Sequence, residues 1–242
     1  RSIVPWAAAA ALAALALYLG GQQRGWTGAA LMLPALLALF YCMRRLLPEG
    51  TLRLRPGLPS VIALRGVIPA AFFACEAFIP LLLSRERGLE PFHAGLALSL
   101  GALGWFAGSW YQGNAYRGDR RTRLVQVGAA LMVLGVLATA SLLLPTMPLA
   151  VAFAGWSLTG IGMGLVFPSL SVLVLSLSPP DQQGRNSSAL QLSEALAVTT
   201  MLAISGSVFA ALLTQAPMTG YAAVFGMAVV LLIVGNLVAR RI

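Results

Sequence analysis

The sequence predicts an all-α membrane protein of about eight transmembrane helices, arranged as a bundle with three-helix repeats. Its 242 residues are 59% hydrophobic and 10% charged, with a mean hydropathy of +0.85, whereas soluble domains are about 45–50% apolar and about 25% charged. Eight apolar runs follow one another along the chain. Since none of them alternates with period two, helices rather than a barrel are expected to cross the lipid.

The apolar runs define the predicted helices in order. They cover residues 3–20, 28–43, 60–84, 93–114, 124–144, 149–176, 188–213 and 220–239. Between them stand helix-stopping sequences such as Gly20-Gly21, Pro48-Glu49-Gly50 and Pro179-Pro180-Asp181. Eight helices of about 20 residues would use about 160 residues of the chain. The connections are therefore short, which excludes a large aqueous domain.

The polarity of the helices follows a rhythm of three. Residues 28–43, 124–144 and 220–239 carry almost no polar side chains, whereas the other helices carry the glutamates, most of the glycines and the hydroxyl groups. Every third helix is thus expected to face lipid. Such a rhythm is typical of the inverted three-helix repeats of secondary transporters.

The charge predicts an orientation and not a nucleic-acid partner. The net charge is +9, and all sixteen cations are arginines. If successive connections lie on alternate sides of the membrane, thirteen arginines, Arg65 among them, lie on the same side as both chain ends. The other side has only Arg24, Arg85 and Arg87. Basic connections remain in the cytoplasm. We therefore expect a multi-pass membrane protein with both ends of this segment in the cytoplasm.

Patterns typical of enzymes, metals and cofactors are missing from the sequence. The chain has one histidine, two cysteines inside apolar runs and no lysine for a phosphate-binding loop. No metalloprotease or nucleophile-elbow motif occurs. The expectation is a protein that is not an enzyme and that needs no cofactor or metal.

Two glutamates inside predicted helices are the leading candidates for chemistry. Glu76 lies about 16 residues from the start of its apolar run, or roughly 25 Å, and Glu194 lies about 8 residues inside, or roughly 12 Å. An acid in lipid is tolerated when it is paired, hydrated or protonated. Each acid could bind protons or line a cavity, or it could hydrogen-bond a neighbouring helix, and for Glu194 with Gln191 both interpretations stay open. Glu76 is favoured as the proton carrier.

Glycines at helical spacing form a second group of candidates. Gly104 and Gly108 lie on the helix predicted at 93–114, and Gly160 and Gly164, followed by Pro168, lie on the helix predicted at 149–176. Both pairs fit the Gly-x-x-x-Gly spacing that lets two helices approach closely. Close packing and a hinge for gating, bent at the proline, are the two interpretations.

Two basic connections separate the helices. Residues 44–59 form the longest one, and they are expected to link residues 1–43 to residues 60–242, to fix orientation and to contact anionic lipid headgroups, or a specific partner. Residues 117–123 form a tight basic turn. That turn serves either as an anchor or as a clamp in which Asp119 and its arginines hold neighbouring helix ends.

Three stretches together resemble the major facilitator superfamily, and most closely its bacterial drug-export-like members. They are Gly108-Ser109-Trp110-Tyr111-Gln112-Gly113 followed by Arg117-Gly118-Asp119-Arg120-Arg121, then Phe167-Pro168-Ser169, and then the segment from Ser178 to Ala189. The resemblance implies twelve helices in the intact protein, of which the last eight are present, so that the absent helices of the same protein would be a partner. It implies that 1–43 are the last two helices of the N-terminal half, 44–59 the central cytoplasmic loop and 60–242 the C-terminal half.

The resemblance also implies roles for single residues. A gating loop would involve Gly108, Asp119, Arg120 and Arg121, the helix predicted at 60–84 would place Glu76 in a central cavity, and the helix predicted at 149–176 would place Trp156 and Thr159 near the pathway. We expect a secondary transporter that moves a small organic solute by alternating access with protons, as proton-coupled efflux. The alternative is a transporter-like scaffold or sensor that moves nothing.

Overall fold

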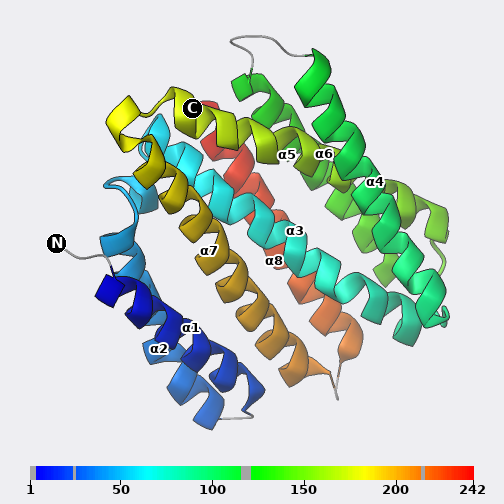
Figure 1. Cartoon of the computed structure of the whole chain (residues 1–242). Helices are drawn as coiled ribbons and strands as arrows, with labels where there is room; N and C mark the ends of the chain where they lie inside the picture. The colour runs from blue at the N-terminus through cyan, green and yellow to red at the C-terminus, as the bar shows by residue number, and fades with distance from the viewer. Residues whose placement is uncertain (1–3, 24–25, 116–120, 214–215) are drawn as a thin grey trace.

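The computed structural model describes residues 4–23, 26–115, 121–213 and 216–242, and this part of the chain is helical without a strand. Figure 1 shows the helices as one bundle. The eight α-helices are α1 (Val4–Gln22), α2 (Trp26–Leu46), α3 (Leu58–Glu86), α4 (Pro91–Ala115), α5 (Arg121–Thr139), α6 (Leu149–Ser176), α7 (Gln183–Leu212) and α8 (Pro217–Val238). The prediction of an all-α bundle is confirmed.

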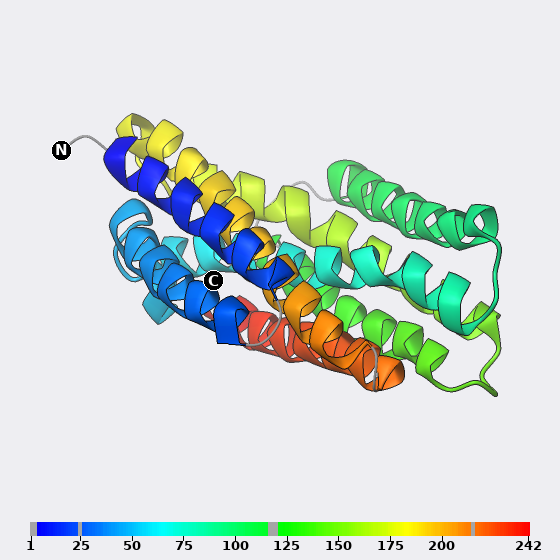
Figure 2. The ribbon, with the colours of Figure 1, turned by 90° about the horizontal axis from the view of Figure 1, so that it is seen from below.

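Seven of these eight helices are long and apolar enough to cross a membrane, and α4 is not among the seven. Its 25 residues include His93 and end in a Ser-Trp-Tyr-Gln-Gly-Asn sequence, which lowers its hydropathy. Even so, α4 crosses α6 in close contact at Gly101, Gly104 and Gly108, and the two helices are neighbours in both views (Figures 1 and 2). The seven apolar helices indicate an integral, multi-pass membrane protein. The contact with α6 shows that α4 is packed in the same bundle.

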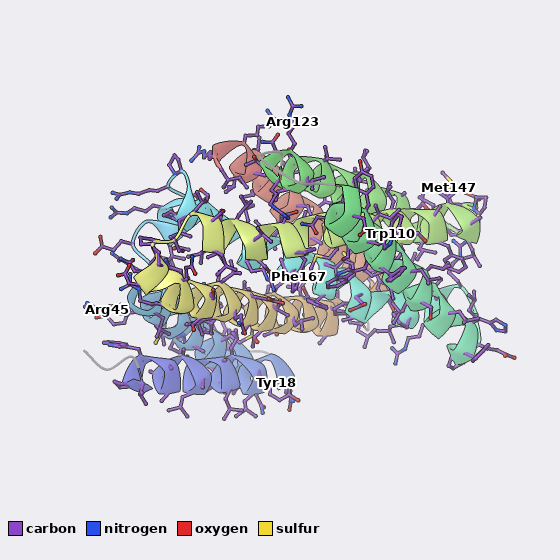
Figure 3. The ribbon with its side chains drawn as sticks, turned by 45° about the horizontal axis from the view of Figure 1, so that its top comes forward. Tyr18, Arg45, Trp110, Arg123, Met147 and Phe167 are labelled. Carbon is purple, nitrogen blue, oxygen red and sulfur yellow. The ribbon has the colours of Figure 1, made fainter. Side chains whose placement is uncertain are left out.

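Helix ends gather at two opposite ends of the bundle, marked in Figure 3 by Arg45 and Met147. At the end marked by Arg45, the amide of Gly57 donates to the carbonyl of Arg241 over 3.1 Å, and Gln126 donates to the carbonyl of Ala239. These bonds bring together the start of α3, the start of α5 and the end of α8. We call this the arginine-rich end, because its described cations are Arg44, Arg45, Arg53, Arg55, Arg121, Arg123, Arg185, Arg240 and Arg241.

Glycines let α6 pack between two neighbours. A methyl group on Gly160 or Gly164 would collide with the backbone of α4, and one on Gly104 or Gly108 would collide with the backbone of α6. The opposite face of α6 meets α5 in the same way through Gly162. Contact between backbones replaces contact between side chains here, as at the small-residue interfaces of membrane helices.

The outer surface of the bundle is apolar, as lipid requires. Large exposed side chains include Leu37 and Phe40 on α2, Leu134 on α5 and Ile233 on α8, in agreement with the helices expected to face lipid. Exposed apolar residues also cover α4, for example Leu103. Exposure to the surroundings is thus not confined to every third helix.

Candidate functional site

Arg65 lies inside a helix, which corrects the sequence interpretation. The charge analysis placed it with the arginines of the connections, but it sits two turns into α3 and is only 6% exposed. Its neighbour Gly66 explains how it comes to face α7. A methyl group on Gly66 would lie 2.8 Å from Oγ of Ser193, so α3 and α7 approach closely beside Arg65. The residue after Ser193 is Glu194.

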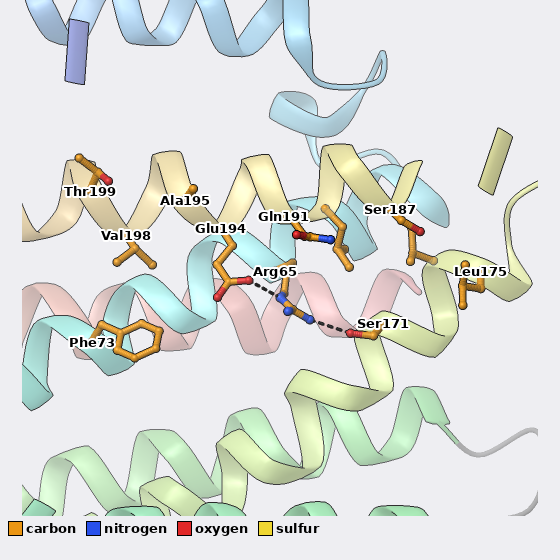
Figure 4. Close-up of a pocket in the computed structure, with 12 residues that line it drawn as sticks. Arg65, Phe73, Ser171, Leu175, Ser187, Gln191, Glu194, Ala195, Val198 and Thr199 are labelled. Atoms are coloured by element: carbon orange, nitrogen blue, oxygen red, sulfur yellow. Dashed lines mark hydrogen bonds and ion pairs between the residues drawn. The ribbon is translucent and has the colours of Figure 1, made fainter. Parts of the chain in front are cut away.

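The guanidinium of Arg65 joins three helices. Its Nε donates to Oε2 of Glu194 on α7 over 2.8 Å, and its Nη1 donates to Oγ of Ser171 on α6 over 2.8 Å (Figure 4). Nη1 also donates to the carbonyl of Phe167 on α6 over 3.0 Å. Its Cζ also lies 3.3 Å from the centre of the Phe167 ring. The arginine side chain is 7% exposed and that of the glutamate 22%. The buried charge of Arg65 is thus compensated by the partly buried carboxylate of Glu194 and by hydrogen bonds, as burial of a charge demands.

A cavity of about 620 Å³ opens beside this ion pair, between α3, α6 and α7 (Figure 4). Gln191 and Glu194, two of the residues proposed from the sequence, line it. Its walls combine apolar side chains with hydroxyl, amide and charged groups. The full lining is Arg65, Phe73, Ser171, Val174, Leu175, Ser187, Leu190, Gln191, Glu194, Ala195, Val198 and Thr199.

Glu76 does not line this cavity. It is half-buried on α3, eleven residues beyond Arg65, or about 16 Å along the helix axis. Among the described residues, nothing donates a hydrogen bond to its carboxyl group and no cation pairs with it. The structure therefore separates the two glutamates, and of these two only Glu194 has a countercharge within the described part of the chain.

Trp156 and Thr159 lie in the packed interior. Trp156 is 1% exposed and stacks on Phe72 with ring centres 4.8 Å apart, and Thr159 is fully buried and donates to the carbonyl of Gly155. Neither lines the cavity beside Arg65. Their placement near a transport pathway, which the family resemblance implied, stays a prediction.

The candidates for gating are only partly described. Asp119 and Arg120 lie outside the described residues, Arg121 is the first residue of α5, and Gly108 packs on the backbone of α6.

Pro168, the predicted hinge, leaves a free backbone carbonyl on Gly164, and this carbonyl has a partner that the sequence did not reveal. Because proline has no amide hydrogen, the carbonyl of Gly164 loses its partner within α6. Ser109 of α4 donates to that carbonyl over 3.3 Å. The proline therefore lies beside a hydrogen bond between α4 and α6.

Sequence reasoning missed Arg65, Phe167 and Ser171 as members of the site. The one available signal was an arginine inside the apolar run 60–84, where a charge needs a partner. Ser171 carried no signal of its own, and Phe167 entered only as part of a stretch that resembles the family.

The fold and this site define a polytopic membrane protein with a charged pair buried beside a cavity between helices. Residues 2–200 match the family model of the Major Facilitator Superfamily. This chain belongs to that family, and it is accordingly a membrane transporter, since members of the family are transporters rather than enzymes. No match was found among curated proteins.

Proposed function

We propose that this transporter exports a small organic solute by alternating access, in exchange for protons that move the opposite way. The observation that carries the proposal is the cavity beside the Arg65–Glu194 pair. Its volume of about 620 Å³ falls in the range of about 300–1,000 Å³ that is usual for small-molecule sites.

The lining of the cavity supports a solute with an apolar body and a few hydrogen-bonding groups. Val174, Leu190 and Val198 offer apolar contacts, whereas Ser187 and Gln191 offer hydrogen bonds. The pair itself contributes one charge of each sign, so the described lining is neutral overall.

The two glutamates receive different roles in this proposal. Glu194 is held by Arg65, so we assign it to the structure of the cavity wall. Glu76 has no countercharge among the described residues, and an intramembrane acid in that position is tolerated when it is hydrated or protonated. Glu76 is therefore the group that we assign to proton transfer.

The same proposal gives the two parts of the chain a role in alternating access. Residues 1–43 and 60–242 belong to halves that rock against each other, and residues 44–59 connect them. The arginine-rich end faces the cytoplasm by the distribution of its charges. There the hydrogen bonds of Arg65 to Glu194, Ser171 and Phe167 hold α3, α6 and α7 together while the cavity closes and opens.

The test uses the intact protein in liposomes that enclose the pH indicator pyranine. With a pH gradient imposed, a panel of small amphipathic organic solutes is screened for solute-driven proton movement. We expect Glu76→Gln to abolish this movement, while thermal stabilisation by the active solute persists. Glu86→Gln, which changes an exposed carboxylate on the same helix, is expected to leave both unchanged.

Full proton coupling in Glu76→Gln would remove Glu76 from the mechanism. Solute flux that never moves protons would contradict exchange, and the lack of flux for every solute in the panel would contradict the proposed substrate class.

A further inference from the structure

The connection between α2 and α3 forms a second hollow, separate from the cavity beside Arg65. It encloses about 260 Å³ at the arginine-rich end and shares no lining residue with the first cavity. Four charged side chains line it, and they belong to Arg44, Glu49, Arg53 and Arg55. The remaining lining is Met43, Leu47, Pro48, Gly50 and Leu52.

The charge of this hollow is not compensated within the described protein. Three arginines face one glutamate, and none of the four side chains forms an ion pair with a described residue. All four are exposed. The hollow thus presents an excess of two positive charges on guanidinium groups, whose paired N–H donors match the oxygens of a phosphate group.

The backbone of the connection holds these arginines in place. The amides of Arg53 and Arg55 both donate to the carbonyl of Gly50 over 3.1 Å, and the hydroxyl of Thr51 donates to the carbonyl of Pro48 over 2.8 Å. Gly50 has a φ of 89°, and Leu54 has a φ of 52°, which a leucine rarely adopts. Such backbone persists only where the surrounding structure imposes it, and it gathers at functional sites.

The side chain of Arg55 is positioned by the same turn. A methyl group on Gly50 would lie 2.7 Å from its Cδ, so the aliphatic part of Arg55 covers the face of the glycine. An arginine that is already oriented loses less conformational freedom when it binds a ligand.

An apolar surface leads along α2 to the hollow. Leu33, Leu37 and Phe40 are 64%, 63% and 53% exposed, and their spacing places them on the helix face that ends at Arg44. Near the end of the helix, Arg45 lies over the rings of Trp6 and Tyr41 at 5.7 Å and 5.4 Å from their centres. Aromatic and cationic groups of this kind mark the headgroup level of a membrane.

We propose that this hollow binds the phosphate group of an anionic membrane phospholipid, whose acyl chains lie along the exposed face of α2. The exposed apolar face favours a lipid over a soluble phosphate, because acyl chains can fill contacts along it and a soluble anion cannot. The site is independent of the proposed transport function.

Native mass spectrometry of the intact, detergent-purified protein tests the site. Phosphatidylglycerol and phosphatidylcholine are titrated separately onto the wild type, the double variant Arg53→Gln/Arg55→Gln and the control Arg123→Gln/Arg185→Gln. The control removes the same charge elsewhere, and Figure 3 shows Arg123 well apart from the neighbourhood of Arg45. We expect one tightly retained phosphatidylglycerol, a loss of about tenfold or more in its affinity in the double variant, and a change under twofold in the control.

Three results would overturn the proposal. Equal losses in the double variant and the control would indicate attraction to charge in general. Unchanged retention in the double variant would exclude the hollow, and displacement of the lipid by millimolar inorganic phosphate or glycerol 1-phosphate would indicate a soluble anion. Melting temperatures report whether the variants fold, and the single substitutions Arg53→Gln and Arg55→Gln carry the same comparison if the double variant does not.

Discussion

Nε of Arg65 lies 2.8 Å from Oε2 of Glu194, so two charges that are 129 residues apart in the chain neutralise each other inside the bundle. No sequence pattern identifies this pair, because Arg65 lies on α3 and Glu194 lies on α7. Because Arg65 also donates to α6, the loss of this one side chain removes contacts to two helices.

Removing both partners of the pair is expected to destabilise the protein by less than the two single removals added together. Arg65→Gln or Glu194→Gln leaves a charge without its partner, at a cost of about 3 kcal/mol, the low end for buried pairs because the side chain of Glu194 is 22% exposed. In the double variant Arg65→Gln/Glu194→Gln no unpaired charge remains, so its loss should be smaller than the sum of the two single losses. Unfolding in mild detergent gives the free energies of unfolding of the wild type, the two single variants and the double variant. Strictly additive losses would contradict a direct interaction.

The hydrogen bond from Ser109 should matter only while residue 168 is proline. Ser109→Ala is expected to lower the free energy of unfolding by about 0.5–1.5 kcal/mol, because the carbonyl of Gly164 loses its donor. In Pro168→Ala the new amide can reach that carbonyl within α6. Ser109→Ala should then have almost no effect, which the same unfolding measurement checks. An equal loss in both backgrounds would show that Ser109 acts in another way.

Gly160 should not tolerate a methyl group. Its Cβ would collide with the carbonyl of Gly101 on α4, so Gly160→Ala is expected to cost on the order of 1–3 kcal/mol through overpacking. Gly226→Ala is the matched control, because nothing lies within 4 Å of its Cβ position in α8. A helical glycine in open space gains about 0.5–1 kcal/mol on substitution by alanine. Similar melting temperatures for the two variants would contradict the close contact of α4 and α6.

Arg87 should stabilise the end of the bundle opposite to the arginine-rich end. It donates to the carbonyls of Met147, Leu144 and Leu142 at 2.6, 2.8 and 3.4 Å. Arg87→Gln is expected to cost about 1.5 kcal/mol, because two of these bonds are short and come from a charged group. Arg85→Gln, which removes an exposed charge from the same end, should cost less than half as much. Proteolysis of the α5–α6 connection gives a local readout, and equal cleavage in both variants would contradict the role of Arg87.

The helices could be predicted because each one satisfies its own backbone in lipid. The run at 149–176 corresponds to α6 (Leu149–Ser176), and the runs at 60–84 and 220–239 differ from α3 and α8 by only a few residues. The start of α7 was less predictable. It begins at Gln183 and not at 188, because polar residues can continue a helix outside the apolar layer, where hydropathy carries no signal.

The partners of the polar groups could not be predicted in the same way. The sequence singled out Glu194 and left open whether it titrates or pairs, and the packing of α3 on α7 supplied Arg65. Trp156 and Thr159 were expected near a pathway by resemblance, and only the structure shows that the rotation of α6 buries both side chains against neighbouring helices.

The sequence by itself determined that the chain folds as a bundle of apolar helices, with most arginines on one side and few polar groups in the interior. Hydrophobicity and charge act on each segment locally, so these features need no knowledge of the neighbours. Only the tertiary structure decided that Glu194 meets Arg65, that Glu76 stands apart and that three arginines gather in one hollow. The first relationship depends on the close approach of α3 and α7 at Gly66, and the hollow depends on the backbone turn at Gly50, so neither follows from the hydrophobicity or charge of one segment.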